Sequence, residues 1–174
     1  LMGGTIAVES KKGVGTTFTV EIPMELTSSE KVEKTKKPAK RKSLKGIKVL
    51  LAEDNDLNAE LAAILLEDSE MIVTRAADGQ EVADLFANHP AGTYDIILMD
   101  IMMPKMDGLQ AAKAIRAMQA ERPDAEEIPI IALSANAFAE DVQTSLDAGM
   151  NGHVSKPLNV AEVAKVIARN LNKS

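Results

Sequence analysis

Four separated segments of the sequence end a short apolar run with polar side chains of different kinds. The runs and the residues that follow them are 47–52 with Glu53 and Asp54, 96–99 with Asp100, 128–133 with Ser134, and 152–154 with Ser155 and Lys156. Carboxylates supply the hard oxygen ligands that Mg²⁺ prefers, and hydroxyl and ammonium groups donate to phosphoryl oxygens. Each residue alone also has a structural explanation, because a strand-end Asp often caps a turn and a lone Lys is commonly a surface residue.

The apolar runs predict buried strands of a parallel sheet, because they are continuous rather than alternating and end in turn-forming residues. From residue 47 onward strand and helix patterns alternate, which predicts an α/β fold with helices on both faces of the sheet. We expect strands near residues 47–52, 71–75, 95–99, 129–133 and 152–155, and helices near residues 56–68, 79–88, 108–119, 139–147 and 159–171. Apolar residues at helical spacing predict buried stripes on the first and last helices: Leu57, Leu61, Ile64 and Leu65, and Val160, Val163, Val166 and Ile167.

Right-handed crossovers leave few topologies for such a chain, and the flavodoxin-like, doubly wound order 2-1-3-4-5 is the expected one. This order makes Asp54 and Asp100 neighbours at the carboxyl edge of the sheet, where ligands of open α/β sheets bind. Crowded carboxylates repel one another unless a cation neutralises them. Oxygen ligands without a neighbouring His or Cys favour Mg²⁺ over zinc.

These residues resemble the receiver domain of two-component response regulators. The matching motifs are Glu53-Asp54, Asp100 with Met103-Pro104-x-Met106-Asp107-Gly108, Ser134-Ala135 and Lys156-Pro157, in the order and spacing of that family. The resemblance extends from residue 47 to the C-terminus. The first motif, Glu53-Asp54-Asn55-x-x-Asn58, particularly resembles receivers attached to hybrid sensor kinases.

The resemblance implies a role for each residue of the acidic cluster. Asp100 is expected to be the nucleophile that forms an aspartyl-phosphate. Asp54 and Asp100 are expected to bind Mg²⁺ directly, with the backbone carbonyl of Met102, while Glu53 acts partly through water. Lys156 is expected to contact the phosphoryl group, and its bond to the following proline is usually cis in the family.

The resemblance also implies a conformational switch. Ser134 is expected to donate to the phosphoryl oxygens and to move toward them, which reshapes the loop after the fourth strand. His153 occupies the place where the family usually has a Tyr or Phe that follows this movement. A half-buried strand histidine without a switching role is an equally weighted interpretation.

Two further segments precede this domain, which we assign to residues 47–174. Residues 1–26 predict a β-hairpin with strands near 5–9 and 16–22 and with Gly13 and Gly15 as turn residues. They resemble the end of a histidine-kinase ATPase domain whose nucleotide-binding segments are missing here, so we expect no ATP site. Residues 27–46 hold eight Lys and Arg against two Glu, and their composition predicts a flexible linker rather than a nucleic-acid site.

Composition excludes several other classes of function. The sequence has no Cys, which excludes disulfides, thiolate zinc sites and thiol catalysis and fits a cytoplasmic protein. Only 2% of residues are aromatic, which disfavours base stacking, and no apolar stretch is long enough to span a bilayer. We therefore expect no nucleic-acid partner and no membrane contact by this chain, although a full-length kinase could be membrane-anchored.

The expected function is a phosphorelay step. The chain, as a fragment of a sensor histidine kinase, would accept phosphate from the kinase's dimerisation and phosphotransfer domain and pass it to a histidine phosphotransfer protein. An aspartyl phosphatase would need a second Asp where Met102 stands, and a flavin module would need a phosphate loop where Glu53 and Asp54 stand. A pure scaffold would be favoured only if a site residue were missing. A stand-alone response regulator, a phosphorylation-gated interaction module and a homodimer through the receiver surface stay open.

Overall fold

The computed structural model of the protein describes residues 4–13, 15–23, 44–135 and 139–170. The chain divides into two compact units, Leu1–Arg41 and Lys42–Ser174. Most of the predicted linker, residues 27–43, and the final residue of the predicted last helix lie outside the described ranges. Among the described helices, none combines the length and apolar character that crossing a membrane requires.

The described part of the first unit is an antiparallel hairpin, as predicted. Strands β1 (Thr5–Lys11) and β2 (Gly15–Glu21) pair from Thr5 opposite Glu21 to Lys11 opposite Gly15, so both reach further into the turn than expected. Gly13 has a φ of 80°, which residues with a Cβ rarely adopt. The apolar side chains of Ile6, Val8, Phe18 and Val20 come from directly opposed pairs and are exposed.

The second unit is built on a five-stranded parallel sheet with the order β4-β3-β5-β6-β7. The strands are β3 (Lys48–Ala52), β4 (Ile72–Ala76), β5 (Ile96–Asp100), β6 (Ile130–Ser134) and β7 (Gly152–Ser155). Numbered within this unit, the order is 2-1-3-4-5, which confirms the flavodoxin-like topology. The central strand β5 is buried along its whole length, as its continuous apolar run predicts.

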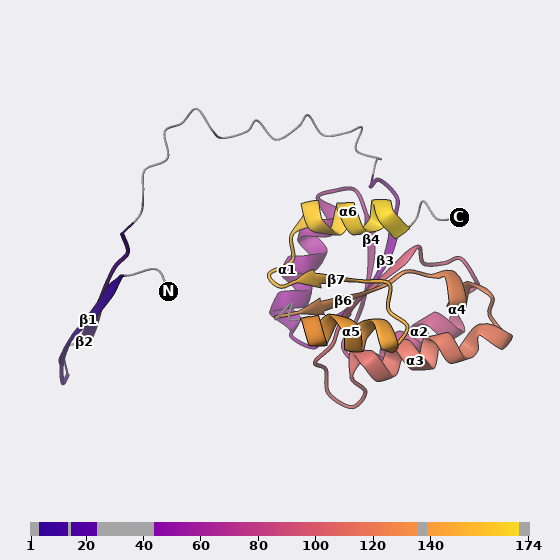
Figure 1. Ribbon diagram of the computed structural model, residues 1–174. Coiled ribbons are helices and arrows are strands. Elements are labelled where there is room, and N and C mark those ends of the chain that lie inside the picture. The colour runs from indigo at the N-terminus through magenta and orange to yellow at the C-terminus, as the bar shows by residue number, and fades with distance from the viewer. Residues whose placement is uncertain (1–3, 14, 24–43, 136–138, 171–174) are drawn as a thin grey trace. The chain divides into compact units, whose positions relative to one another are not determined.

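Helices cover both faces of this sheet (Figure 1). Helices α1 and α6 lie on one face, and α2, α3 and α5 lie on the other. The helices are α1 (Asp56–Glu67), α2 (Gly79–Asn88), α3 (Gly108–Ala117), α4 (Asp124–Glu127), α5 (Ala139–Asp147) and α6 (Val160–Asn170). Asn55, Asp78 and Asp107 begin α1, α2 and α3 with side-chain caps, which helps to explain why these starts were predicted correctly.

The predicted buried stripe of α6 agrees with the structure, but that of α1 was wrong. Val163 and Ile167 of α6 are buried in the core. On α1 the buried residues are instead Ala59, Ala62, Ala63 and Leu66, whereas Leu57, Leu61, Ile64 and Leu65 are 65, 52, 55 and 43% exposed. Both sets fit a helical period. Small alanines let the helix backbone pack closely against the sheet, where four large side chains would leave too little space.

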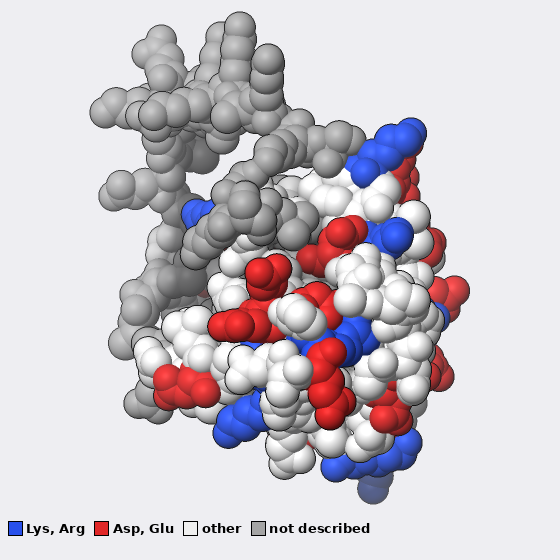
Figure 2. Space-filling model, turned by 90° about the vertical axis from the view of Figure 1, so that its right-hand side faces the viewer, with Lys and Arg blue, Asp and Glu red and all other residues white. Residues whose placement is uncertain are grey.

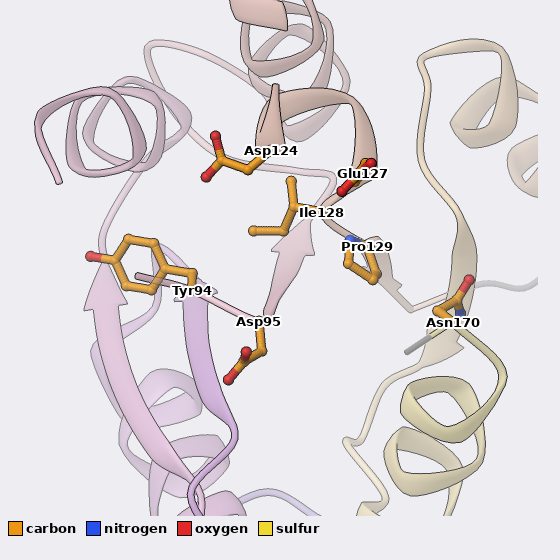
Figure 3. Close-up of a pocket in the computed structure, with 7 residues that line it drawn as sticks. All are labelled: Tyr94, Asp95, Asp124, Glu127, Ile128, Pro129 and Asn170. Carbon is orange, nitrogen blue, oxygen red and sulfur yellow. The ribbon is translucent and has the colours of Figure 1, made fainter. Parts of the chain in front are cut away.

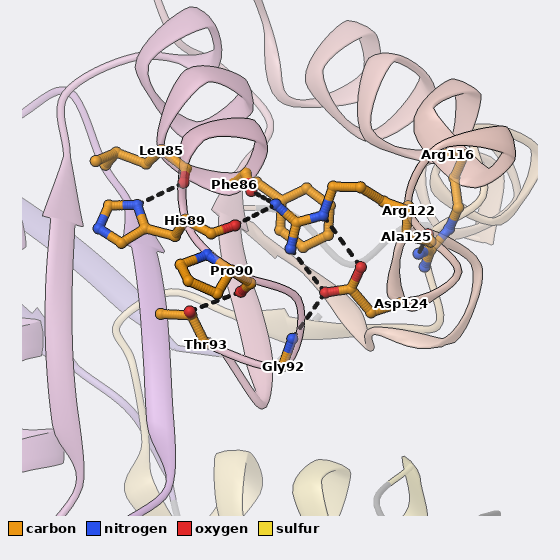
Figure 4. Close-up of polar contacts among 10 residues, drawn as sticks. All are labelled: Leu85, Phe86, His89, Pro90, Gly92, Thr93, Arg116, Arg122, Asp124 and Ala125. Atoms are coloured by element: carbon orange, nitrogen blue, oxygen red, sulfur yellow. Dashed lines mark hydrogen bonds and ion pairs between the residues drawn. The ribbon is translucent and has the colours of Figure 1, made fainter.

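The predicted helix 108–119 also ends early, and the short helix α4 after it was not predicted. A 3₁₀ turn, Met118–Ala120, follows α3. The chain beyond it is held by Arg122, whose guanidinium lies 4.1 Å from the Phe86 ring centre and donates to the carbonyls of Phe86 and His89 (Figure 4). The Arg122 guanidinium also pairs with Asp124, the first residue of α4, at 2.8 Å. These are tertiary contacts, which local sequence periodicity does not reveal.

The predicted linker extends too far at its C-terminal end. Leu44 packs against the core on the α1 side of the sheet. The Gly46 amide donates to the Glu70 carbonyl at 2.8 Å, and Gly46 has a φ of 79°. Residues 44–46 therefore belong to the second unit, because the turn that they form aligns the start of β3.

Candidate functional site

The polar residues at the four strand ends meet at the carboxyl edge of the sheet. Glu53 directly follows β3, and its amide donates to the Ala76 carbonyl at the end of β4 at 3.1 Å. Asp100 is the last residue of β5 and lies opposite Leu133, the neighbour of Ser134. Parallel pairing of these strands thus collects the four groups at one edge.

Carboxylate oxygens of Glu53, Asp54 and Asp100 all lie within 4.8 Å of one another. Glu53 and Asp100 are only 5% exposed, whereas Asp54 is exposed to solvent. The trio contains only oxygen donors, which suits Mg²⁺ better than zinc. An acidic group of this kind fits a divalent cation because three clustered carboxylates carry more negative charge than one ammonium ion neutralises.

That ammonium ion belongs to Lys156, which follows β7. Its Nζ lies 2.5 Å from Glu53 Oε2 and 2.6 Å from Asp100 Oδ2, so one cation joins two buried carboxylates. Burial raises the pKa of the Asp100 carboxyl, and hydrogen bonds from Lys156 and the Met102 amide offset only part of that rise. Burial lowers the pKa of the Lys156 ammonium, but its hydrogen bonds to Asp100 and Glu53 outweigh this and leave the pKa above its ordinary value.

The loop between β5 and α3 holds Asp100 from the other side. The Met102 amide donates to Asp100 Oδ1 at 3.1 Å, and the Met102 side chain is 80% exposed. Gly108 packs so closely that a Cβ there would lie 2.1 Å from the Asp100 carbonyl oxygen. The loop can therefore return to the sheet only with glycine at this position, which places the Met102 backbone beside the carboxylates.

The same loop is tied to the start of α2 by a pair that was not predicted. Lys105 Nζ lies 2.5 Å from Asp78 Oδ2, and the hydrogen bond from Lys105 lowers the pKa of the buried Asp78 carboxyl. The Gly79 amide donates to the Met106 carbonyl at 3.1 Å. The sequence analysis did not identify this pair, because the contact joins residues that are 27 positions apart.

Ser134 and His153 are brought together. Ser134 is the last residue of β6, and its Oγ lies 3.0 Å from His153 Nε2 on β7. His153 is half-buried, and its Nδ1 is buried without a hydrogen-bond partner among the described residues. Both interpretations of His153, a strand histidine and a switch partner, are compatible with this contact.

Asn58 is a further site residue that was not assigned a role. Its Nδ2 donates to Glu53 Oε1 at 3.0 Å. The only signal in the sequence was its place in the motif Glu53-Asp54-Asn55-x-x-Asn58.

The Lys156–Pro157 bond is cis, as the resemblance implied.

A second group of acidic residues lies at the opposite, amino-terminal edge of the sheet. A hollow of about 180 Å³ there is lined by Tyr94, Asp95, Asp124, Glu127, Ile128, Pro129 and Asn170 (Figure 3). Asp95 accepts from the Lys48 amide at 2.7 Å, and Asp124 is paired with Arg122 and the Gly92 amide. On the face shown in Figure 2, acidic and basic side chains of the described residues are interspersed without a continuous field of one sign. Asp95 and Asp124 thus hold local structure at this edge, whereas among the described residues only the trio at the carboxyl edge forms an acidic cluster that could hold a metal ion.

Comparison with known proteins places this geometry in context. Residues 49–168 match the response regulator receiver domain family. The chain is 38% identical over 152 residues to hybrid signal transduction histidine kinase B of Dictyostelium discoideum, covering 83% of this chain and 8% of that protein. It is 34% identical over 171 residues to the aerobic respiration control sensor protein ArcB of Escherichia coli, covering 97% of this chain and 20% of that protein. The chain thus spans a small part of the length of these relatives.

Solved structures of receiver domains resemble the second unit. The receiver domain of sensor histidine kinase PA1611 from Pseudomonas aeruginosa PAO1 has a TM-score of 0.64 and 35% identity, covering 74% of this chain and 99% of that one. That structure has a magnesium ion coordinated in its active site cleft. The receiver domain of Ssk1 in complex with the histidine phosphotransfer signaling protein Ypd1, from Saccharomyces cerevisiae, matches with a TM-score of 0.63 and 27% identity, covering 72% of this chain and 89% of the matched chain.

Proposed function

The chain belongs to the response regulator receiver domain family, and on that premise we propose that Asp100 accepts a phosphoryl group from phosphohistidine in a Mg²⁺-dependent transfer. One observation carries the proposal. The buried Asp100 carboxylate lies within 4.8 Å of Glu53 and Asp54 oxygens and 2.6 Å from the Lys156 ammonium. This arrangement combines a nucleophilic carboxylate oxygen with two sources of positive charge, the Lys156 ammonium and a divalent cation held by the carboxylates. Phosphoryl transfer requires such positioning and charge stabilisation from a protein.

The carboxylates of Glu53, Asp54 and Asp100 and the backbone carbonyl of Met102 would hold Mg²⁺. When bound, the ion offsets the repulsion among the acids and stabilises negative charge on the transferring phosphoryl group. Lys156 alone leaves the trio with an excess of negative charge, because one ammonium ion faces three carboxylates and, among the described residues, pairs with Glu53 and Asp100. The exposed Asp54 keeps this side of the site open to a hydrated ion.

The transfer step follows from the same side chains. A lone pair of an Asp100 carboxylate oxygen forms the new bond to phosphorus, while the bond between phosphorus and the donor's imidazole nitrogen breaks. The electron pair of the broken bond remains on that nitrogen, which takes a proton from water. Lys156 and the Ser134 hydroxyl would then donate to the phosphoryl oxygens of the acyl phosphate.

Ser134 links this step to a conformational change. Its Oγ lies 3.0 Å from His153 Nε2, so a Ser134 hydroxyl that turns toward the phosphoryl group changes its contact with His153. The surface formed by β6, β7 and the loops that follow them would thereby depend on the state of Asp100. A phosphorylation-gated interaction surface is compatible with relay and needs no additional site.

We assign the partner surface to the exposed face of α1. Four of the seven exposed large apolar side chains in the described part of the second unit lie there: Leu57, Leu61, Ile64 and Leu65. The helix begins at Asp56, two residues after Asp54, so this face is continuous with the rim of the site. Contiguous exposed apolar side chains mark protein interfaces. A histidine phosphotransfer protein, such as the one solved together with the Ssk1 receiver domain, is the occupant that we propose.

A phosphotransfer assay tests the function directly. A phosphorylated histidine phosphotransfer protein is mixed with the chain, with its Asp100→Asn variant and with its Asp84→Asn variant, an exposed Asp on α2 that serves as the control. We expect label to pass to the wild type and to Asp84→Asn in Mg²⁺, and not after chelation of the metal. Equal transfer to Asp100→Asn, or transfer that ignores chelation, would contradict the proposal.

A further inference from the structure

The Glu53 carboxylate is held at both of its oxygens by groups from two different elements. Asn58 Nδ2, in the first turn of α1, donates to Oε1 at 3.0 Å, and Lys156 Nζ donates to Oε2 at 2.5 Å. A carboxylate only accepts hydrogen bonds, so the nitrogen of the Asn58 amide must be the atom that faces it. Glu53 is 5% exposed, and these two donors fix the plane of its carboxylate.

The backbone of Asn58 is fixed by the start of the same helix. Asn55 caps α1, and its side-chain Oδ1 accepts a hydrogen bond from the backbone N–H of Asn58 at 3.0 Å. The side chain of Asn58 therefore leaves a rigid turn and reaches back toward Glu53, five residues earlier. A capping turn of this kind explains the spacing in the segment Glu53-Asp54-Asn55-x-x-Asn58 as one that brings an amide donor onto a buried carboxylate.

We propose that Asn58 is a positioning residue that orients Glu53 toward Asp54 and Asp100 and thereby sets the affinity of the site for Mg²⁺. The inference rests on the proposed function and deepens it. A ligand that is already ordered before the ion arrives loses less side-chain freedom on binding, and groups that orient metal ligands commonly affect metal affinity. The neutral amide adds a donor without adding a positive charge that would compete with the ion.

The substitution Asn58→Ala separates this role from a structural one. Asn58 is exposed and lies on a helix, where alanine is the more favourable residue, and this gain offsets part of the cost of losing the hydrogen bond to Glu53, so the variant should remain folded. We expect its Mg²⁺ affinity, measured by calorimetric titration, to fall by about tenfold. We also expect the rate of Asp100 labelling to approach the wild-type rate as Mg²⁺ becomes saturating.

A double-mutant cycle with Glu53→Ala tests whether the effect passes through Glu53. If it does, adding Asn58→Ala to Glu53→Ala changes the Mg²⁺ affinity no further. Gln143→Ala is the control, since it removes an exposed helical amide whose Nε2 contacts Asp147 rather than the site. Wild-type affinity in Asn58→Ala, or the same loss in the Glu53→Ala background, overturns the inference.

The outcomes also distinguish this inference from the proposed function. A wild-type chain that binds Mg²⁺ but takes no label overturns the proposed function, and the cycle still decides the role of Asn58. A labelled wild type with no coupling between Asn58 and Glu53 overturns the inference alone. A wild type that binds no Mg²⁺ overturns both.

Discussion

At the scale of single residues, Lys156 makes the burial of Glu53 and Asp100 compatible with a stable fold. Its ammonium lies 2.5 Å from one carboxylate and 2.6 Å from the other. Removing one partner of a buried ion pair is strongly destabilising, because it leaves an uncompensated charge away from water. The structure therefore gives Lys156 a role before any phosphoryl group arrives, in addition to the role proposed for it afterwards.

Asp54 is the member of the trio whose role can be tested with least disturbance of the fold. It is exposed and lies outside the Lys156 pairs, so Asp54→Asn should leave the free energy of unfolding almost unchanged. We expect its Mg²⁺ affinity to fall by at least about tenfold, because it loses a charged oxygen ligand. Titration calorimetry of the Asn and Ala variants measures this, and undiminished affinity in both would remove Asp54 from the site.

At the scale of elements, the proposed function makes α1 the link between the site and a partner. Leu61 is 52% exposed in the middle of the helix, so Leu61→Gln should change the free energy of unfolding by less than about 0.5 kcal/mol. We expect it to slow transfer from a phosphorylated histidine phosphotransfer protein, while labelling by a small phosphodonor stays at the wild-type rate. Leu146→Gln, on α5, is the matched control because Leu146 is 45% exposed.

The alternative occupant of this face is a second copy of the chain. Sedimentation of the wild type and Leu61→Gln decides between them. A wild-type dimer that Leu61→Gln dissociates, with transfer from the phosphotransfer protein unaffected, would assign the face to self-association instead.

The contact between Arg122 and Asp124 predicts a pH dependence of stability. The hydrogen bond from Arg122 lowers the pKa of the Asp124 carboxyl below its ordinary value of 3.8. Asp124 therefore contributes stability that is present above pH 3.8 and is lost as the pH falls through its lower, folded-state pKa. We expect Asp124→Asn to reduce the free energy of unfolding at pH 7 by roughly 1–2 kcal/mol.

Asp124→Asn should reduce the free energy of unfolding by less in acid than at pH 7. Denaturant unfolding of the wild type and Asp124→Asn at pH 7 and again below pH 3.8 measures the difference. A difference that stays constant across this range would show that the charge on Asp124 does not contribute.

The sequence predicts the sheet well because each strand can be recognised from a short apolar run that ends in polar residues. The runs ending at Asp100 and Ser134 are continuous and apolar, and their order follows from crossover handedness. The buried face of α1 was assigned to the wrong stripe because Ala59, Ala62 and Ala63 fit the helical period as well as the leucines do. Periodicity shows that a helix is amphipathic, but the space available between helix and sheet decides which stripe is buried.

In the candidate site, the sequence predicted which carboxylates lie together but not every hydrogen bond that they accept. Strand ends identify Glu53, Asp54 and Asp100, because parallel strands must deliver their last residues to one edge. The hydrogen bond from Asn58 to Glu53 and the pairing of Asp78 with Lys105 were not predicted. Both depend on the directions of individual side chains at the starts of α1 and α2, which the spacing of residues does not specify.

At the scale of the whole molecule, the chain contains two compact units that differ in how much of their side-chain surface is buried. The hairpin has no buried residue among those described, whereas the second unit has a core on each face of its sheet. A two-stranded sheet by itself is marginally stable in water. We expect the second unit to carry the stability and the phosphoryl chemistry of this chain.

Shortening the chain to begin at Ser43 tests this expectation. The shortened protein keeps Leu44 and Gly46, which belong to the second unit, so its Tm should change by less than about 2 °C. Labelling of Asp100 should be unchanged. A fall in Tm of many degrees, measured by calorimetry, would mean that residues 1–42 are an integral part of the second unit.

The most direct test of the account is the identity of the phosphorylated residue. The wild type and Asp100→Asn are incubated with a small phosphodonor in Mg²⁺, weighed intact by mass spectrometry, and then mapped after borohydride reduction of the acyl phosphate. We predict one phosphoryl group on the wild type, located at Asp100, and none on the variant or on the wild type after chelation of the metal. A phosphoryl group mapped to another residue, or equal labelling of Asp100→Asn, would contradict the account.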